Sequence, residues 1–139
     1  MTLTPEEKST LVAYRLKRAD ETYAEAVATC SMKLWPATAN RLYYAAFYAV
    51  SALLLKNSLH AQSHSGVKAL FGMNFIKTGL LDVNYGRTFS RLFEMRQSGD
   101  YDDMFDLTSD DVIPYIEPTK NLINAVKELI GSYPLCIRQ

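Results

Sequence analysis

Apolar residues recur every three or four positions along most of this chain, a spacing typical of amphipathic helices. The pattern is strongest over residues 36–57, where apolar side chains would cover nearly the whole circumference of a helix. A helix of that kind is buried on all sides, so we expect residues 36–57 to form the most buried helix. No stretch alternates with period two for long enough to build a sheet.

Four further helices are predicted around this central one. Thr4, Pro5 and Glu7 mark the first start, because threonine can cap, proline suits a first turn and Glu7 can complete a capping box. Ser63 can cap the third helix, and Gly79 suits its C-terminal end. The predicted ranges are 4–29, 63–78, 84–98 and 108–132.

Two prolines interrupt the last of these ranges. Pro114 and Pro118 fall inside residues 108–132, so this helix is either kinked or starts late. Residues 100–107 are expected to be an acidic loop. The whole chain, residues 1–139, is therefore expected to be one all-α domain, an up-and-down bundle of about five helices.

Composition excludes several classes of protein. At 139 residues the chain fits one domain, and its 48% hydrophobic and 22% charged content fits neither a disordered nor a membrane protein. No apolar run approaches the ~20 residues of a membrane span, and the start MTLTPEEKST lacks the layout of a signal peptide. Two cysteines give no disulfide framework. We expect a cytoplasmic protein with no membrane partner.

The formal net charge of zero conceals an uneven distribution of charge. Residues 58–99 carry five basic and two acidic side chains, whereas residues 100–139 carry three basic and eight acidic ones. The zero net charge excludes a uniformly basic nucleic-acid binder. Any binding of nucleic acid must therefore be confined to a part of the surface where basic side chains gather.

Arg96 is the most informative candidate site residue. It follows Phe89 and Phe93 on an apolar helix face, and a guanidinium is rarely buried there without a partner. That partner could be Asp100, another acid, a second subunit or a ligand phosphate. An ordinary structural ion pair or a snorkelling arginine is one reading; a cluster of Arg96, Asp100 and Tyr101 that binds a ligand is the other.

Residues 36–57 contain a second group of candidates. Asn40 lies in an apolar stretch and needs a hydrogen-bond partner for its amide. With Tyr43 and Tyr44 it forms either a polar element of the core or the floor of a site whose roof includes Arg96.

The two histidines do not predict a metal site. His60 and His64 are four apart, but the cap at Ser63 leaves His60 in a loop, and no third ligand follows. His64 is expected to hydrogen-bond locally or to Asp100 or Tyr101. No phosphate loop, GxSxG, CxxC or HExxH motif is present, and we expect no metal and no cofactor.

Three ordered segments resemble the prokaryotic HEPN family, in its small stand-alone branch. They are residues 40–49 (NRLYYAAFYA), 64–67 (HSGV) and 96–101 (RQSGDY). The resemblance implies a helical bundle that pairs as a homodimer. It also implies nucleotide or RNA as ligand and a minimal nucleotidyltransferase as partner in a toxin–antitoxin-like system.

Many members of that family are metal-independent ribonucleases, in which an arginine is followed four to six residues later by a histidine. Here Arg96 matches the arginine, but the position five residues on is Tyr101, a poor general base near pH 7. We therefore expect binding of nucleotide or RNA with little or no catalysis. An active ribonuclease using Arg96 with Tyr101 or His64 is the first alternative, and a purely structural scaffold is the second.

Overall fold

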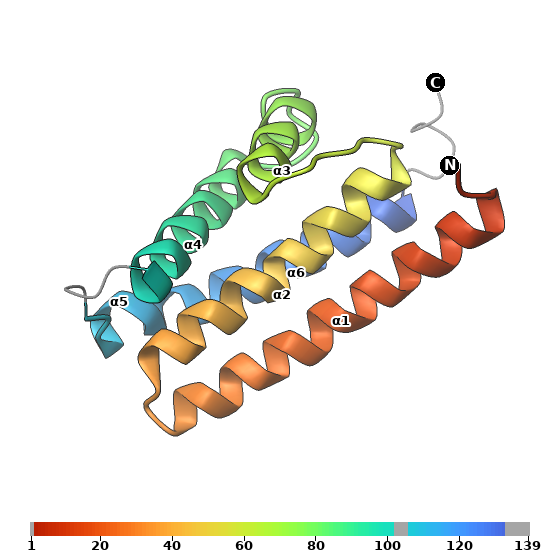
Figure 1. Ribbon diagram of the computed structural model, residues 1–139. Coiled ribbons are helices and arrows are strands. Elements are labelled where there is room, and N and C mark those ends of the chain that lie inside the picture. Colours follow the sequence, from red (N-terminus) through yellow and green to blue (C-terminus); the bar gives the residue numbers. More distant parts are fainter. Residues whose placement is uncertain (1, 102–105, 133–139) are drawn as a thin grey trace.

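The computed structural model describes residues 2–101 and 106–132, and it is an all-α bundle (Figure 1). No strand occurs in these two ranges. The predicted fold class is therefore confirmed. The helices, in chain order, are α1 (Pro5–Ser31), α2 (Trp35–Lys56), α3 (His64–Phe71), α4 (Val83–Tyr101), α5 (Ser109–Val112) and α6 (Ile116–Ser132).

The predicted start of α1 is confirmed in detail. The Thr4 hydroxyl accepts the Glu7 backbone N–H at 3.0 Å, and the Glu7 carboxylate accepts the Thr4 N–H at 2.9 Å. This reciprocal capping box satisfies two of the N–H groups that a helix start leaves without partners. It fixes where the longest helix of the bundle begins.

Helix α2 is the centre of the fold, as its apolar circumference predicts. It packs against α1, α3, α4, α5 and α6, and Leu42, Val50 and Leu53 have no exposed surface. The pairing with α1 is the most extensive, and Figure 1 shows these two helices side by side and antiparallel. Small buried residues on α2 permit this close approach: Ala45, Ala46, Ala49 and Ala52.

The segment between α3 and α4 is more irregular than the predicted single helix. A π-helical turn, Gly72–Ile76, continues α3, and Gly79 then ends it with φ of +84°. That left-handed conformation is accessible to glycine without a Cβ clash, which confirms the predicted helix end. Single π-turns are frequent near functional sites.

Helix α4 extends further than expected. The predicted end near residue 98 was wrong, because the helix continues through Gly99 and Asp100 to Tyr101. Asp100 therefore lies in the last turn of α4 and not in an acidic loop. No proline interrupts this stretch, so the helix continues past the charge reversal.

Proline determines the form of the last helical segment. A capping box between Thr108 and Asp111 begins α5, and a single 3₁₀ turn, Ile113–Tyr115, contains Pro114. Pro118 falls in the first turn of α6, where a missing N–H costs little. The predicted interruption is confirmed, and no helix in the described ranges is long and apolar enough to cross a membrane.

Candidate functional site

The middle of α2, the first turn of α3 and the last turns of α4 meet at one place in the bundle. α2 contributes Tyr43 and Tyr44, α3 contributes His64 and α4 contributes Arg96. These four residues were candidates from sequence, and the fold brings their side chains together. We call them the His64–Arg96 cluster.

The start of α3 positions His64. The Ser63 hydroxyl accepts the Gly66 backbone N–H at 3.0 Å and caps the helix, so His64 is its first residue. Gly66 leaves room for this tight entry, because a Cβ there would lie 3.1 Å from Ser63 Oγ and 3.3 Å from Ala61 Cβ. The HSGV segment is thus a helix start that holds an imidazole at a fixed position.

Tyr43 and His64 form the central hydrogen bond of the cluster. The Tyr43 hydroxyl lies 2.8 Å from His64 Nδ1, and either atom can donate according to the imidazole tautomer. Tyr43 has no exposed surface. Burial raises the pKa of its phenol, a change that the nearby positive charge of Arg96 opposes only in part. The hydroxyl therefore stays protonated at neutral pH.

Arg96 is buried on the apolar face of α4. Its exposed fraction is 6%, and its guanidinium carbon lies 5.1 Å from the Tyr43 ring centroid and 5.7 Å from that of Tyr44. Both distances fall within the range of cation–π attraction, which is stronger where water is excluded. The two tyrosine rings thus hold a permanent positive charge at the edge of the cluster.

The charge of Arg96 also acts on His64. The pKa of the imidazole lies below its ordinary value, first because of burial and second because of the positive charge of Arg96. His64 is therefore neutral at pH 7, and it can accept a proton or donate a hydrogen bond. A positive field at a neutral imidazole is suited to receiving an anionic group.

Aromatic rings hold the cluster in place. The Tyr43 ring stacks on Phe89 with centroids 5.8 Å apart and an interplanar angle of 10°. The Phe47 ring lies 4.7 Å from the imidazole of His64. The sequence did not single out Phe47 as a site residue, although its i, i+4 spacing from Tyr43 was a usable signal.

Asn40 is linked to this cluster through Arg41. The Asn40 side-chain oxygen accepts hydrogen bonds from Arg41 Nε at 3.1 Å and Nη2 at 2.7 Å. The Arg41 guanidinium also pairs with Glu25 at 3.0 Å and lies 5.5 Å from the Tyr44 ring centroid. Tyr44 thus contacts two guanidinium groups, and Arg41 is a neighbour of the site that sequence reasoning did not select.

The structure describes the backbone but not the side chains of two candidates, Asp100 and Tyr101. The backbone places them in α4, at one turn beyond Arg96. The predicted Arg96–Asp100–Tyr101 constellation therefore stays a prediction. Among the described residues, no three His, Cys, Asp or Glu side chains gather as metal ligands.

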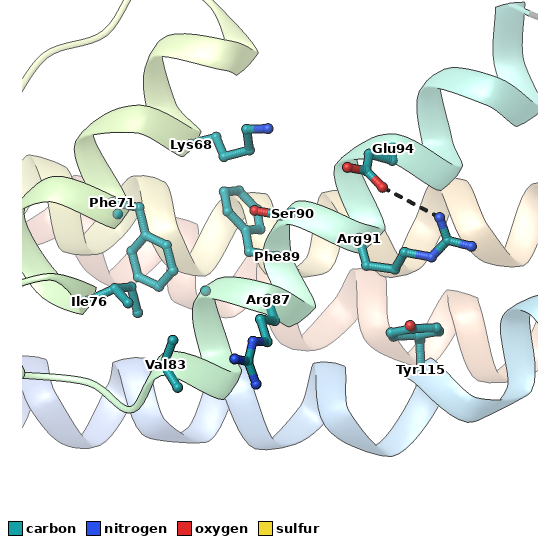
Figure 2. Close-up of a pocket in the computed structure, with 12 residues that line it drawn as sticks. Lys68, Phe71, Ile76, Val83, Arg87, Phe89, Ser90, Arg91, Glu94 and Tyr115 are labelled. Carbon is teal, nitrogen blue, oxygen red and sulfur yellow. Dashed lines mark hydrogen bonds and ion pairs between the residues drawn. The ribbon is translucent and has the colours of Figure 1, made fainter.

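A cavity of about 560 Å³ lies beside this region, between α3, the π-helical turn and α4 (Figure 2). Phe71, Ile76 and Val83 make much of its wall apolar, as Figure 2 shows. Arg91 lines it too but is neutralised by Glu94, whose carboxylate is 3.4 Å away. Lys68 and Arg87 line the cavity as well, so its wall is apolar but also carries positive charge.

A family model described as the HEPN domain matches residues 12–129 of the chain. The chain belongs to the HEPN family. The match includes α2, α3 and α4, the helices that build the His64–Arg96 cluster. The resemblance carried by the three sequence segments is therefore confirmed at the level of the family.

Relatives of this HEPN chain include a UPF0332 protein of Thermotoga maritima, which is 36% identical over 124 residues, covering 89% of this chain and 94% of the relative. "Putative toxin MJ0142" of Methanocaldococcus jannaschii is 32% identical over 93 residues, 67% of this chain and 63% of that protein. "Putative toxin MJ0605" of the same organism is 34% identical over 83 residues, 60% of this chain and 62% of that protein.

Proposed function

We propose that this HEPN protein binds RNA or a nucleotide through a phosphate group at the His64–Arg96 cluster. The observation that carries the proposal is that the guanidinium of Arg96 is buried against Tyr43 and Tyr44, the same two rings that contact the imidazole of His64. A guanidinium beside a neutral imidazole can donate hydrogen bonds to a phosphate, and the low local dielectric strengthens the attraction. Tyr44, half-buried at the same place, offers an aromatic face to a base.

Binding of a labelled single-stranded oligonucleotide, followed by fluorescence anisotropy, tests this proposal. Arg96→Gln removes the charge and keeps the length of the stem, so it should weaken binding at least tenfold. Arg91→Gln is the matched control, because Arg91 is an exposed arginine on the same helix that already pairs with Glu94. Equal affinity of the two variants would contradict the proposal.

A second candidate is metal-independent cleavage of RNA, and the Tyr43–His64 hydrogen bond favours it. In this reaction the imidazole takes the proton of a ribose 2′-OH, the 2′-oxygen bonds to phosphorus, and the bond to the 5′-oxygen breaks. The 5′-oxygen leaves with a proton from solvent or the imidazolium, and a 2′,3′-cyclic phosphate remains. Tyr43 orients the imidazole, and Arg96 stabilises the charge on the phosphate. Tyr101 is the other proton-transfer candidate.

Cleavage is tested with a defined RNA in the presence of a chelator. An active protein should form products with 2′,3′-cyclic phosphate ends, and His64→Asn should slow their formation at least a hundredfold. Gln62→Ala, an exposed change one residue before the cap, should cleave like the wild type. Tyr101→Phe separates the two proton-transfer candidates, because it should slow cleavage only if Tyr101 transfers the proton. If no cleavage occurs while the oligonucleotide binds, the protein acts by binding alone.

We further propose that the protein works in the cytoplasm as a homodimer in a toxin–antitoxin-like system with a minimal nucleotidyltransferase. The names of two relatives contain the word toxin, which supports this setting. The neighbouring open reading frame should encode such a nucleotidyltransferase, and the two proteins should copurify when coexpressed. Light scattering should give twice the monomer mass of 15.7 kDa at micromolar concentration. A monomer would contradict the proposed dimer.

A further inference from the structure

A cavity of about 530 Å³ lies between α1, α2 and the loop before α3, next to the His64–Arg96 cluster. Phe47 forms part of its wall, and the same ring lies 4.7 Å from the imidazole of His64. Phe47 therefore borders both the cavity and the imidazole of His64. The cavity is also lined by Tyr48 from α2 and by Arg15 and Arg18 from α1.

Arg15 is the unusual member of this set. Its guanidinium is partly buried and donates one hydrogen bond, from Nη1 to the Ser51 carbonyl at 3.3 Å. In the described ranges, it forms no ion pair with a carboxylate. A partly buried cation without an anion costs free energy, which an incoming phosphate would recover. Arg15 is thus poised for an anion that the described part of the chain does not supply.

The rest of the cavity suits a nucleotide. The Arg18 guanidinium lies 5.2 Å from the Tyr48 ring centroid and is paired with Glu21 at 3.1 Å. These two contacts keep the planar guanidinium in a fixed position. Phe47, Tyr48 and the exposed Tyr14 add aromatic surface of the kind on which bases stack. No carboxylate belongs to the described lining of the cavity.

We propose that this cavity is a second subsite, in which Arg15 binds a phosphate and Tyr48 and Phe47 contact a base of the nucleotide next to the one at His64. The inference rests on the proposed binding of RNA at the His64–Arg96 cluster and extends it to a strand with at least two phosphates, one more than a dinucleotide without terminal phosphates carries. An acidic peptide would satisfy Arg15 as well. The aromatic wall and its continuity with His64 favour the nucleic acid.

The test compares a 2′-O-methyl dinucleotide with a 2′-O-methyl tetranucleotide, because neither can be cleaved through a 2′-OH. The tetranucleotide should bind the wild type more tightly. Arg15→Met should reduce affinity for the tetranucleotide about fivefold or more and leave the dinucleotide within about twofold. In Arg15→Met, the slope of log K for tetranucleotide binding against log salt concentration should be smaller in magnitude by about 0.7 than in the wild type. This is the effect of losing one phosphate contact with a single strand.

Two controls separate binding from folding. Arg15→Met keeps the apolar stem and removes a partly buried charge, so its melting temperature should equal or exceed that of the wild type. Arg15→Lys restores a charge and should recover most of the salt slope. Arg91→Gln, an exposed arginine on α4, should bind both probes like the wild type.

Each outcome has a definite meaning. If Arg15→Met binds the tetranucleotide like the wild type, or an acidic peptide binds there in preference to it, the subsite is overturned. If Arg96→Gln leaves dinucleotide binding intact while Arg15→Met still weakens the tetranucleotide, the proposed function fails and the subsite stands. A loss of both probes in Arg15→Met, accompanied by a lower melting temperature, would make Arg15 a structural residue and overturn the subsite.

Discussion

The hydroxyl of Tyr43 lies 2.8 Å from Nδ1 of His64, a residue 21 positions further along the chain. One partner is fully buried in α2, and the other begins α3 at the edge of the bundle. The hydrogen bond connects the core to a place where a neutral imidazole and a buried guanidinium lie together. The effect of removing this bond can be measured separately from that of removing the Tyr43 ring.

Tyr43→Phe should destabilise the protein by about 1 kcal/mol, the usual net value of one hydrogen bond. The phenylalanine ring can keep its stacking on Phe89 and its contact with Arg96, so the loss is confined to the hydroxyl. Urea denaturation measures the change. Tyr14→Phe is the control, since Tyr14 is 56% exposed. The hydrogen bond would carry no stability if both variants unfolded like the wild type.

The stability of the protein should fall with pH below about 6.5 because of His64. Its pKa in the folded protein is lowered by burial and by Arg96, whereas the unfolded chain has the ordinary value near 6.5. Between these two values the unfolded chain binds the proton and the folded protein does not. The contribution of neutral His64 is therefore complete above pH 6.5 and is lost as pH falls through the folded pKa.

Urea denaturation between pH 7.5 and pH 5 checks this dependence by comparing the wild type with His64→Asn. The asparagine amide can occupy the place of Nδ1 but does not titrate, so the variant should lose part of the pH slope. Other groups titrate equally in both proteins and cancel in the difference. A slope that is identical in the two proteins would contradict the lowered pKa.

Inorganic phosphate should raise the pKa of His64. An anion bound between the imidazole and Arg96 stabilises the imidazolium form and offsets the positive charge that lowers the pKa in the ligand-free protein. Proton NMR of the imidazole resonance across a pH titration measures the shift. Arg96→Gln should raise the ligand-free pKa by itself and remove the further rise with phosphate. A pKa that does not respond to phosphate in the wild type would argue against an anion site.

Phe89→Ala should cost about 3–5 kcal/mol. The ring has no exposed surface, stacks on Tyr43 and meets Phe71 edge-on at 5.5 Å between centroids. The cavity left behind would also loosen Tyr43, so phosphate binding should weaken. Phe93→Ala is the comparison, because that ring is only half-buried beneath Lys68, and its loss should cost less. Chemical denaturation of both variants decides whether Phe89 supports the cluster as proposed.

The local elements could be predicted because their signals lie within a few residues. The capping box of Thr4 and Glu7, the cap at Ser63 and the glycine at 79 each act over a single turn, and all three are confirmed. The end of α4 was misplaced because acidic residues after Arg96 resemble a loop in composition, while nothing in the backbone stops the helix there. Charge is a weaker terminator of a helix than proline or a left-handed glycine.

The sequence by itself determined an all-α bundle of the HEPN family, the central place of α2 and the position of Arg96 on an apolar helix face, because helical periodicity and three ordered segments encode them. Tertiary structure alone decided that His64 meets Tyr43 and Arg96, and that Arg15 lines a cavity beside Phe47. Those relationships join residues on four different helices. They depend on how α1, α3 and α4 pack around α2, and no local spacing in the chain records that packing.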